Sequence, residues 1–153
     1  MIEEHVNFNS NGMKLEGILS YDEDAGEPSS LLLCPPHPHL GGDMENNVIT
    51  TLGKSLAVKG FITLRFNYRG VGNSESVYDN IADKYNYWEA VLNNDNYTDA
   101  LTDAASALNY LESAVDVDNI YIAGYSFGAV VAMMVSIKDV RIKAFAAVST
   151  PFG

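Results

Sequence analysis

The sequence has little of the chemistry that disulfide-stabilised, nucleic-acid-binding or membrane-spanning proteins need. Among its 153 residues there is one cysteine, Cys34, so an intrachain disulfide is excluded and a reducing compartment fits. Cys34 follows three leucines, which favours a buried strand residue over a reactive thiol. Lysine and arginine number 9 against 20 Asp and Glu, for a formal net charge of −11. Because nucleic acids and anionic membranes bind clustered positive charge, we expect neither as a partner.

Long apolar runs are also missing. Every run falls well short of the roughly 20 residues that a helix needs to cross a bilayer. The acidic amino-terminal segment MIEEHVNFNSNG lacks the apolar core of a signal peptide. Hydrophobic residues make up 47% and charged residues 19%, a globular composition that argues against disorder. We therefore expect a cytoplasmic protein in which residues 1–153 form a single domain.

Histidine is scarce, and none of the three lies beyond His39. The triplet His37-Pro38-His39 suggests a metal site, but no third ligand stands at a recognisable spacing and Pro38 restricts the local geometry. The segment RGVGNS, residues 69–74, contains two glycines but lacks the G-K-[ST] of a phosphate-binding loop. We expect no metal and no cofactor.

Strand and helix patterns alternate along the chain. Two amino-terminal strand patterns are separated by Asn11-Gly12, a pair that favours a tight hairpin. Short apolar runs typical of strands buried in a parallel sheet then alternate with helical periodicities. The runs are 31–36, 61–68, 119–125 and 142–150, and the helices are 47–60, 97–114 and 127–138. This alternation predicts an α/β fold with a mostly parallel sheet and right-handed crossovers.

The segment from about residue 75 to 97 interrupts that alternation. It is long for a strand-to-helix connection, which is usually about 2–6 residues. The segment contains the only tryptophan, Trp88, and four tyrosines, Tyr78, Tyr85, Tyr87 and Tyr97. Two interpretations stay open. The insertion is either an aromatic flap beside an active-site cleft or a short helix near 82–92 that only packs on the surface.

The pentapeptide GYSFG, residues 124–128, joins a strand pattern directly to a helix pattern. A serine hydroxyl is a poor nucleophile unless it is held in strained, exposed geometry next to a base. A sharp strand-to-helix turn supplies that geometry for Ser126, and Gly124 and Gly128 let the strand and helix approach closely. The helix points its amino terminus at the serine, so the Phe127 N–H is a natural oxyanion donor. The motif predicts a nucleophilic Ser126, with Tyr125 at the site rim.

The loop CPPHPHLGGDM, residues 34–44, follows the first buried strand. In this architecture the second oxyanion N–H comes from that loop, and the main-chain N–H of His39 or Leu40 is the predicted donor. We place His37 and Arg69 at the site rim. In sites built on such a strand–serine–helix turn, the acid and then the histidine follow the nucleophile along the chain. His37 and His39 both precede Ser126, so neither is assigned as the base.

Together, PPHPHLGGDM, FNYRGVGNS and GYSFG resemble the α/β-hydrolase superfamily. More narrowly, they are similar to small bacterial hydrolases related to dienelactone hydrolases and acyl-peptidase-like esterases. The resemblance extends from about Val6 to Pro151. It implies a serine hydrolase that acts on a small-molecule ester, thioester or amide through an acyl-enzyme.

The resemblance also implies two later strands that carry the acid and the histidine, and these are not found in the 153 residues. The segment AFAAVSTPFG would be the sixth strand of the usual eight. We therefore expect a version of a longer hydrolase that is truncated after the sixth strand. The exposed edge strand, 144–148, is expected to pair with another chain, as in a homodimer. The alternative is a non-catalytic binding or interaction module, or an inactive fragment.

Overall fold

The computed structural model describes residues 1–26, 28–116 and 118–150. In these ranges, no helix has both the length and the apolarity that a bilayer span requires. The elements follow in the order β1 (Ile2–Ser10), β2 (Met13–Tyr21), β3 (Ser29–Cys34), α1 (Asn47–Val58), β4 (Phe61–Phe66), α2 (Ile81–Asn93), α3 (Thr98–Ala114), β5 (Ile120–Tyr125), α4 (Phe127–Lys138) and β6 (Ile142–Val148).

The strands form one mixed sheet in the order β1-β2-β4-β3-β5-β6. β1 pairs antiparallel with β2, and β2 pairs antiparallel with β4, whereas β3, β4, β5 and β6 run parallel. The hairpin turn holds Asn11 and Gly12 at positive φ, as the Asn-Gly pair predicts. At the centre, Leu32 lies between Leu64 and Ile122. The predicted α/β fold is confirmed.

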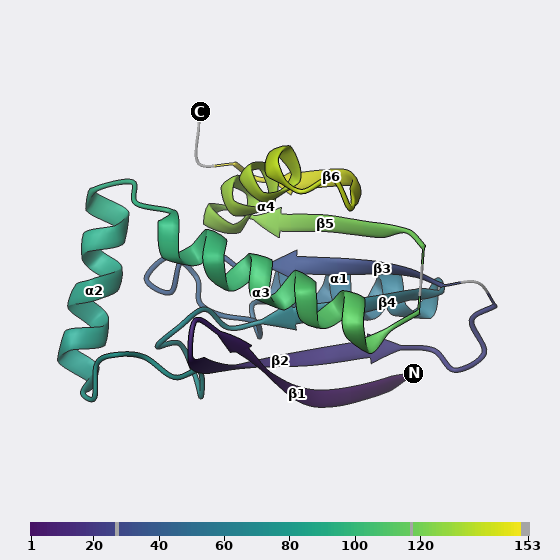
Figure 1. The fold of residues 1–153 in the computed structure, drawn as a ribbon, viewed down its shortest axis with the longest axis horizontal. Coiled ribbons are helices and arrows are strands. Elements are labelled where there is room, and N and C mark those ends of the chain that lie inside the picture. The colour runs from purple at the N-terminus through teal and green to yellow at the C-terminus, as the bar shows by residue number, and fades with distance from the viewer. Residues whose placement is uncertain (27, 117, 151–153) are drawn as a thin grey trace.

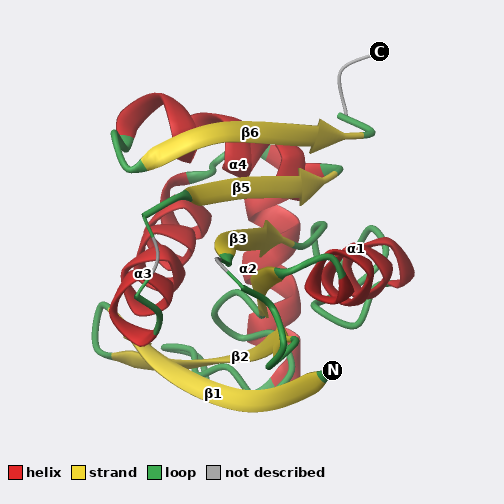
Figure 2. Ribbon diagram, turned by 90° about the vertical axis from the view of Figure 1, so that its right-hand side faces the viewer, coloured by secondary structure: helices red, strands yellow, loops and turns green. Residues whose placement is uncertain are grey.

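Helices cover both faces of the sheet (Figure 2). α1 lies on one face, above a small cluster that includes Leu33 and Ile49. α3 and α4 lie on the other face, and the main core packs there around Leu32, Leu108 and Val131. Cys34 is fully buried in this core, and burial raises the pKa of its thiol. The prediction that Cys34 is a buried strand residue is therefore confirmed.

The insertion contains helix α2, which stands across the end of the sheet toward which β3 and β5 point (Figure 1). Its first turn is capped by Asn80, whose side chain accepts a hydrogen bond from the Asp83 N–H. The helix matches the second interpretation of the insertion, but it does more than cover the surface. Trp88 and Val91 are buried, and Trp88 belongs to the main core.

β6 lies at one edge of the sheet with little covering it. Six of its seven residues are exposed, and the Phe145 side chain is 47% exposed. An apolar cavity of about 240 Å³ opens beside the strand, with Leu52, Leu56 and Phe61 among its lining residues. A long apolar edge offers unpaired backbone groups to another chain. Pairing of two copies through β6 stays a prediction.

If copies pair through this edge, Phe145→Lys should weaken the association, because it places a charge on the paired strand. Sedimentation velocity over a concentration series should show a dimer for the wild-type protein and a shift toward monomer for the variant. Val140→Lys is the matched control, since Val140 is 98% exposed and lies outside β6. A wild-type monomer at every concentration would refute the pairing.

Candidate active site at the elbow

Ser126 lies in the turn between β5 and α4, within the segment 124–128 that we call the elbow. Its backbone has φ 58° and ψ −117°, a left-handed φ that costs a non-glycine residue about 1–3 kcal/mol. The Ser126 N–H donates to the carbonyl of Val148 at 2.9 Å, so the end of β6 holds the turn. The strand–turn–helix context that the motif predicts is present. Backbone strain of this kind clusters at functional sites.

The two elbow glycines occupy positions where no side chain fits. A Cβ at Gly124 would lie 1.9 Å from the carbonyl oxygen of Gly128. A Cβ at Gly128 would lie 2.0 Å from the carbonyl oxygen of Cys34 and 2.5 Å from that of Pro35. The second contact joins the elbow to the loop after β3. The close approach that the G-x-S-x-G spacing predicts is therefore found between β5 and α4, and between α4 and this loop.

Phe127 is the first residue of α4, and its N–H has no protein acceptor within the part of the chain that the structure describes. Such N–H groups at a helix amino terminus are suited to stabilising negative charge. The Phe127 side chain is buried, with its ring stacked on Tyr97 at a centroid distance of 4.9 Å. The predicted role of Phe127 as an oxyanion donor is thus compatible with the geometry.

His37 lies beneath the elbow and not at its rim, because its side chain is completely buried. Its Nε2 lies 2.7 Å from the carbonyl oxygen of Trp88, and its Nδ1 lies 3.0 Å from the backbone nitrogen of His39. Burial lowers the pKa of His37 and outweighs the opposing effect of the Trp88 hydrogen bond. The ring is therefore neutral near pH 7, with the proton on Nε2, since a carbonyl oxygen can only accept.

The second predicted oxyanion donor is not free in this conformation. The His39 N–H donates to Nδ1 of His37, and the Leu40 N–H donates to the carbonyl oxygen of His37 at 2.8 Å. Both candidates are thus occupied within the loop of residues 34–44, which we call the oxyanion loop. The cause is local, because residues 37–40 form a tight turn around the His37 acceptors.

Arg69 also departs from the predicted rim position. Its guanidinium is directed into α3, where it donates to the fully buried carboxylate of Asp103 at 2.9 Å and lies 3.4 Å from Asp99. Burial alone would lower the pKa of Arg69, but the hydrogen bonds to Asp103 raise it overall. Tyr125 is half-buried and packs against the small cluster under α1. Arg69 is therefore a structural cation, and Tyr125 belongs in part to the core.

A cavity of about 310 Å³ lies between the oxyanion loop, the loop after β4 and α2. Its walls include His39, Lys84, Tyr85 and Trp88. The His39 ring stacks on Tyr85 with a centroid distance of 4.0 Å. Tyr85 and Trp88 of α2 thus lie beside the oxyanion loop, where the aromatic-flap interpretation of residues 75–97 expects this segment. The cavity borders the predicted donor His39, and its Trp88 wall packs against Phe127.

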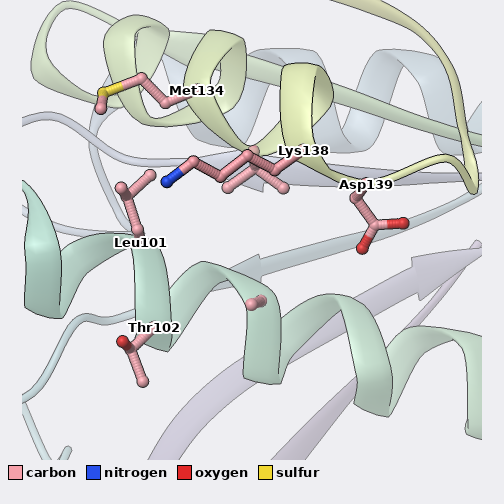
Figure 3. A pocket seen from close by; sticks show the side chains of 7 residues that line it. Leu101, Thr102, Met134, Lys138 and Asp139 are labelled. Carbon is pink, nitrogen blue, oxygen red and sulfur yellow. The ribbon is translucent and has the colours of Figure 1, made fainter.

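A second cavity, of about 270 Å³, lies between α3 and α4 (Figure 3). Lys138 extends along it toward Leu101, and Met134 lies on the α4 side. No elbow residue lines this cavity or the one beside α2, but the cavity beside α2 includes His39 of the oxyanion loop and Trp88, whose ring packs against Phe127. Within the described residues, no group of three or more His, Cys, Asp and Glu side chains is placed to hold a metal ion. The elbow, which holds Ser126 and the Phe127 N–H, and the cavity beside α2 therefore form the candidate active site.

Residues 31–153 match the family model described as the alpha/beta hydrolase fold. This segment covers most of the chain and includes both the oxyanion loop and the elbow. The protein therefore belongs to the α/β-hydrolase fold family.

Relatives extend the comparison to nearly the whole chain. An uncharacterized protein of Rickettsia prowazekii is 31% identical over 147 residues, which cover 95% of this chain and 55% of that protein. The crystal structure of a protein of unknown function from Agrobacterium tumefaciens is 32% identical, with a TM-score of 0.75, over 96% of this chain and 60% of that one. A serine hydrolase homologue from Coxiella burnetii is 29% identical, with a TM-score of 0.74, over 96% and 62% respectively. The chain thus spans between 55% and 62% of the length of these relatives.

Proposed function

We propose that this chain supplies the nucleophile part of a serine hydrolase that cleaves esters, thioesters or amides of small molecules. The observation that carries the proposal is the strained backbone of Ser126 at the amino terminus of α4. A non-glycine residue at φ 58° is costly, and a fold retains such strain where the surrounding structure requires it. Close packing of the elbow glycines supplies that requirement.

In the proposed reaction, the Oγ of Ser126 attacks the carbonyl carbon of the substrate and forms a C–O bond. The carbonyl electrons move to the oxygen, and the Phe127 N–H stabilises the resulting oxyanion. Collapse of this intermediate breaks the bond to the leaving group, which takes up the proton that Ser126 loses. Water then attacks the acyl-enzyme, releases the acid and restores the serine hydroxyl.

The reaction needs a base for Ser126 and an acid that orients it, and we assign neither within these 153 residues. His37 is enclosed and bonded to Trp88, so it is not available to take a proton from the serine. Because the chain spans about 60% of the solved relatives, the complete activity is proposed for the whole protein. The nucleophile and one oxyanion donor are what this chain contributes.

One observation favours a second candidate function, a non-catalytic binding module. Both candidates for the second oxyanion donor are occupied by His37. A hole with a single donor stabilises the oxyanion less, because loss of one donor costs roughly 10²–10³ in kcat.

A fluorophosphonate probe separates the two functions. An activated serine forms an O–P bond with the probe and expels fluoride, so we expect the whole wild-type protein, which is proposed to supply the base, to be labelled and its Ser126→Ala variant to give no signal. Ser136→Ala is the matched control, because Ser136 lies on α4, the helix that begins directly after Ser126, and its hydroxyl donates to the carbonyl of Met133. Absence of labelling in the wild-type protein would favour the binding module.

A further inference from the structure

We propose that His37 is a positioning residue that holds the His39 N–H away from Ser126, and that helix α2 keeps His37 in this state. The inference rests on the proposed function, because it concerns the assembly of the oxyanion hole of that same site. It starts from the two hydrogen bonds on the His37 ring, one to α2 and one to the oxyanion loop.

The hydrogen bond to Trp88 fixes the tautomer of His37. The Trp88 carbonyl oxygen can only accept, so the nitrogen that faces it, Nε2, carries the proton. In a neutral ring the other nitrogen, Nδ1, then has a free lone pair. That lone pair accepts the His39 N–H at 3.0 Å. One backbone carbonyl of α2 therefore determines what the His37 ring does to the oxyanion loop.

The neighbouring side chains also hold the His37 ring in place. His37 is completely buried, and its ring packs edge-to-face against Trp88 and Phe127 at centroid distances of 5.4 and 5.3 Å. A ring flip would put Cδ2 in the place of Nδ1 and Cε1 in the place of Nε2, so both hydrogen bonds would be lost, and it would have to open this packing. The neutral ring thus keeps its acceptor directed at the His39 N–H for as long as these neighbours stay in place.

Side-chain hydrogen bonds and a ring contact attach α2 to the rest of the protein. The Trp88 Nε1–H donates to the carbonyl of Arg69 at 3.0 Å, and the Tyr87 hydroxyl donates to Asp99 at 2.6 Å. α2 also places Tyr85 against the His39 ring. The helix therefore contacts the oxyanion loop twice, once through His37 and once through His39.

The cavity beside α2 gives a ligand access to this arrangement. His39, Tyr85 and Trp88 all line it, so a substrate group that enters would contact the residues that hold the donor. If the Trp88 carbonyl moves away from Nε2, the ring loses its fixed tautomer and the His39 N–H can turn toward the oxyanion. A substrate group in the cavity and a complete oxyanion hole would then occur together.

Two substitutions of His37 with opposite chemistry test the proposal. In His37→Gln the side-chain amide can still donate to Trp88 but offers no acceptor at the position of Nδ1, so the His39 N–H is released. In His37→Asn the side-chain carbonyl lies near the position of Nδ1 and can still accept it. We expect Ser126 in the Gln variant to react with a fluorophosphonate at least about tenfold faster than in the Asn variant, within the roughly 10²–10³ that one oxyanion donor supplies.

NMR supplies readouts that do not depend on the reactivity of Ser126. The His39 amide should exchange slowly in the wild-type and Asn proteins and rapidly in the Gln variant. In the unmodified protein, long-range ¹H–¹⁵N spectra should show the His37 proton on Nε2. If no variant is labelled, the proposed function fails while the amide exchange still decides the role of His37.

Three results would overturn the proposal. The first is a wild-type His37 that carries its proton on Nδ1, which needs no variant and no activity. The second is equal His39 exchange in the Gln and Asn variants. The third is a Gln variant that is labelled no faster than the Asn variant, which is the outcome expected if His37 only fills space.

Discussion

Replacing Gly128 with alanine should cost the fold about 4 kcal/mol or more of unfolding free energy, in the range that marks a severe structural fault. The new methyl group would lie 2.0 Å from the Cys34 carbonyl oxygen and 2.5 Å from that of Pro35. Both atoms belong to the backbone at the end of β3, so no flexible side chain can move to make room. The elbow and the oxyanion loop must therefore separate, and fluorophosphonate labelling of Ser126 should fall with stability.

Urea denaturation of the two proteins measures this effect, and Gly26→Ala is the matched control. Gly26 has no atom within 4 Å of the added Cβ and no positive φ. The control should change stability by less than about 1 kcal/mol. A Gly128→Ala protein as stable as the control would show that α4 and the oxyanion loop do not approach as closely as the structure has them.

The second large effect is expected at Asp103, a completely buried carboxylate on α3. It accepts from the Ser10 hydroxyl at 2.7 Å and from both the backbone and the guanidinium of Arg69. Asp103→Asn keeps the size of the side chain but leaves the buried Arg69 cation without its main partner. Breaking a buried pair on one side costs about 3–5 kcal/mol. We expect that loss in the unfolding free energy measured by urea denaturation.

Glu112→Gln is the control for this substitution, because Glu112 also pairs with an arginine, Arg141, but its side chain is 51% exposed. An exposed pair contributes about 0–1 kcal/mol, so the control should remain close to the wild-type protein. Equal and small losses in the two variants would contradict the structural role of the Arg69–Asp103 pair. The pair also matters for α2, since the Arg69 carbonyl accepts from Trp88.

Local sequence patterns were sufficient for most of the fold. The Asn11-Gly12 pair located the hairpin, and continuous apolar runs located the parallel strands, because both signals act over a few neighbouring residues. Helical periodicity located α1 and α3 but gave no sign that a charged residue of α3, Asp103, is buried in the core. A charged residue is buried only with a partner, and its partner Arg69 lies 34 residues away.

The candidate site likewise has one part that the sequence predicts and one part that it does not. The elbow could be predicted because the strand, the serine and the helix are contiguous in sequence. The state of the oxyanion loop could not, since His37 bonds to Trp88 across 51 residues and no spacing rule connects them. A local signal existed for His39, because the side chain of His37, two residues earlier, can accept a hydrogen bond from the His39 backbone N–H. The long aromatic insertion was noticed, but only the structure connects it to the loop.

Peptide mapping of the fluorophosphonate adduct tests the central claim most directly. After labelling, proteolysis and mass spectrometry assign the phosphonyl group to one serine. The strained turn at the amino terminus of α4 predicts a single adduct on Ser126. An adduct on any other serine, or its absence on Ser126 in a folded protein, would contradict the assignment of the elbow as the nucleophile site.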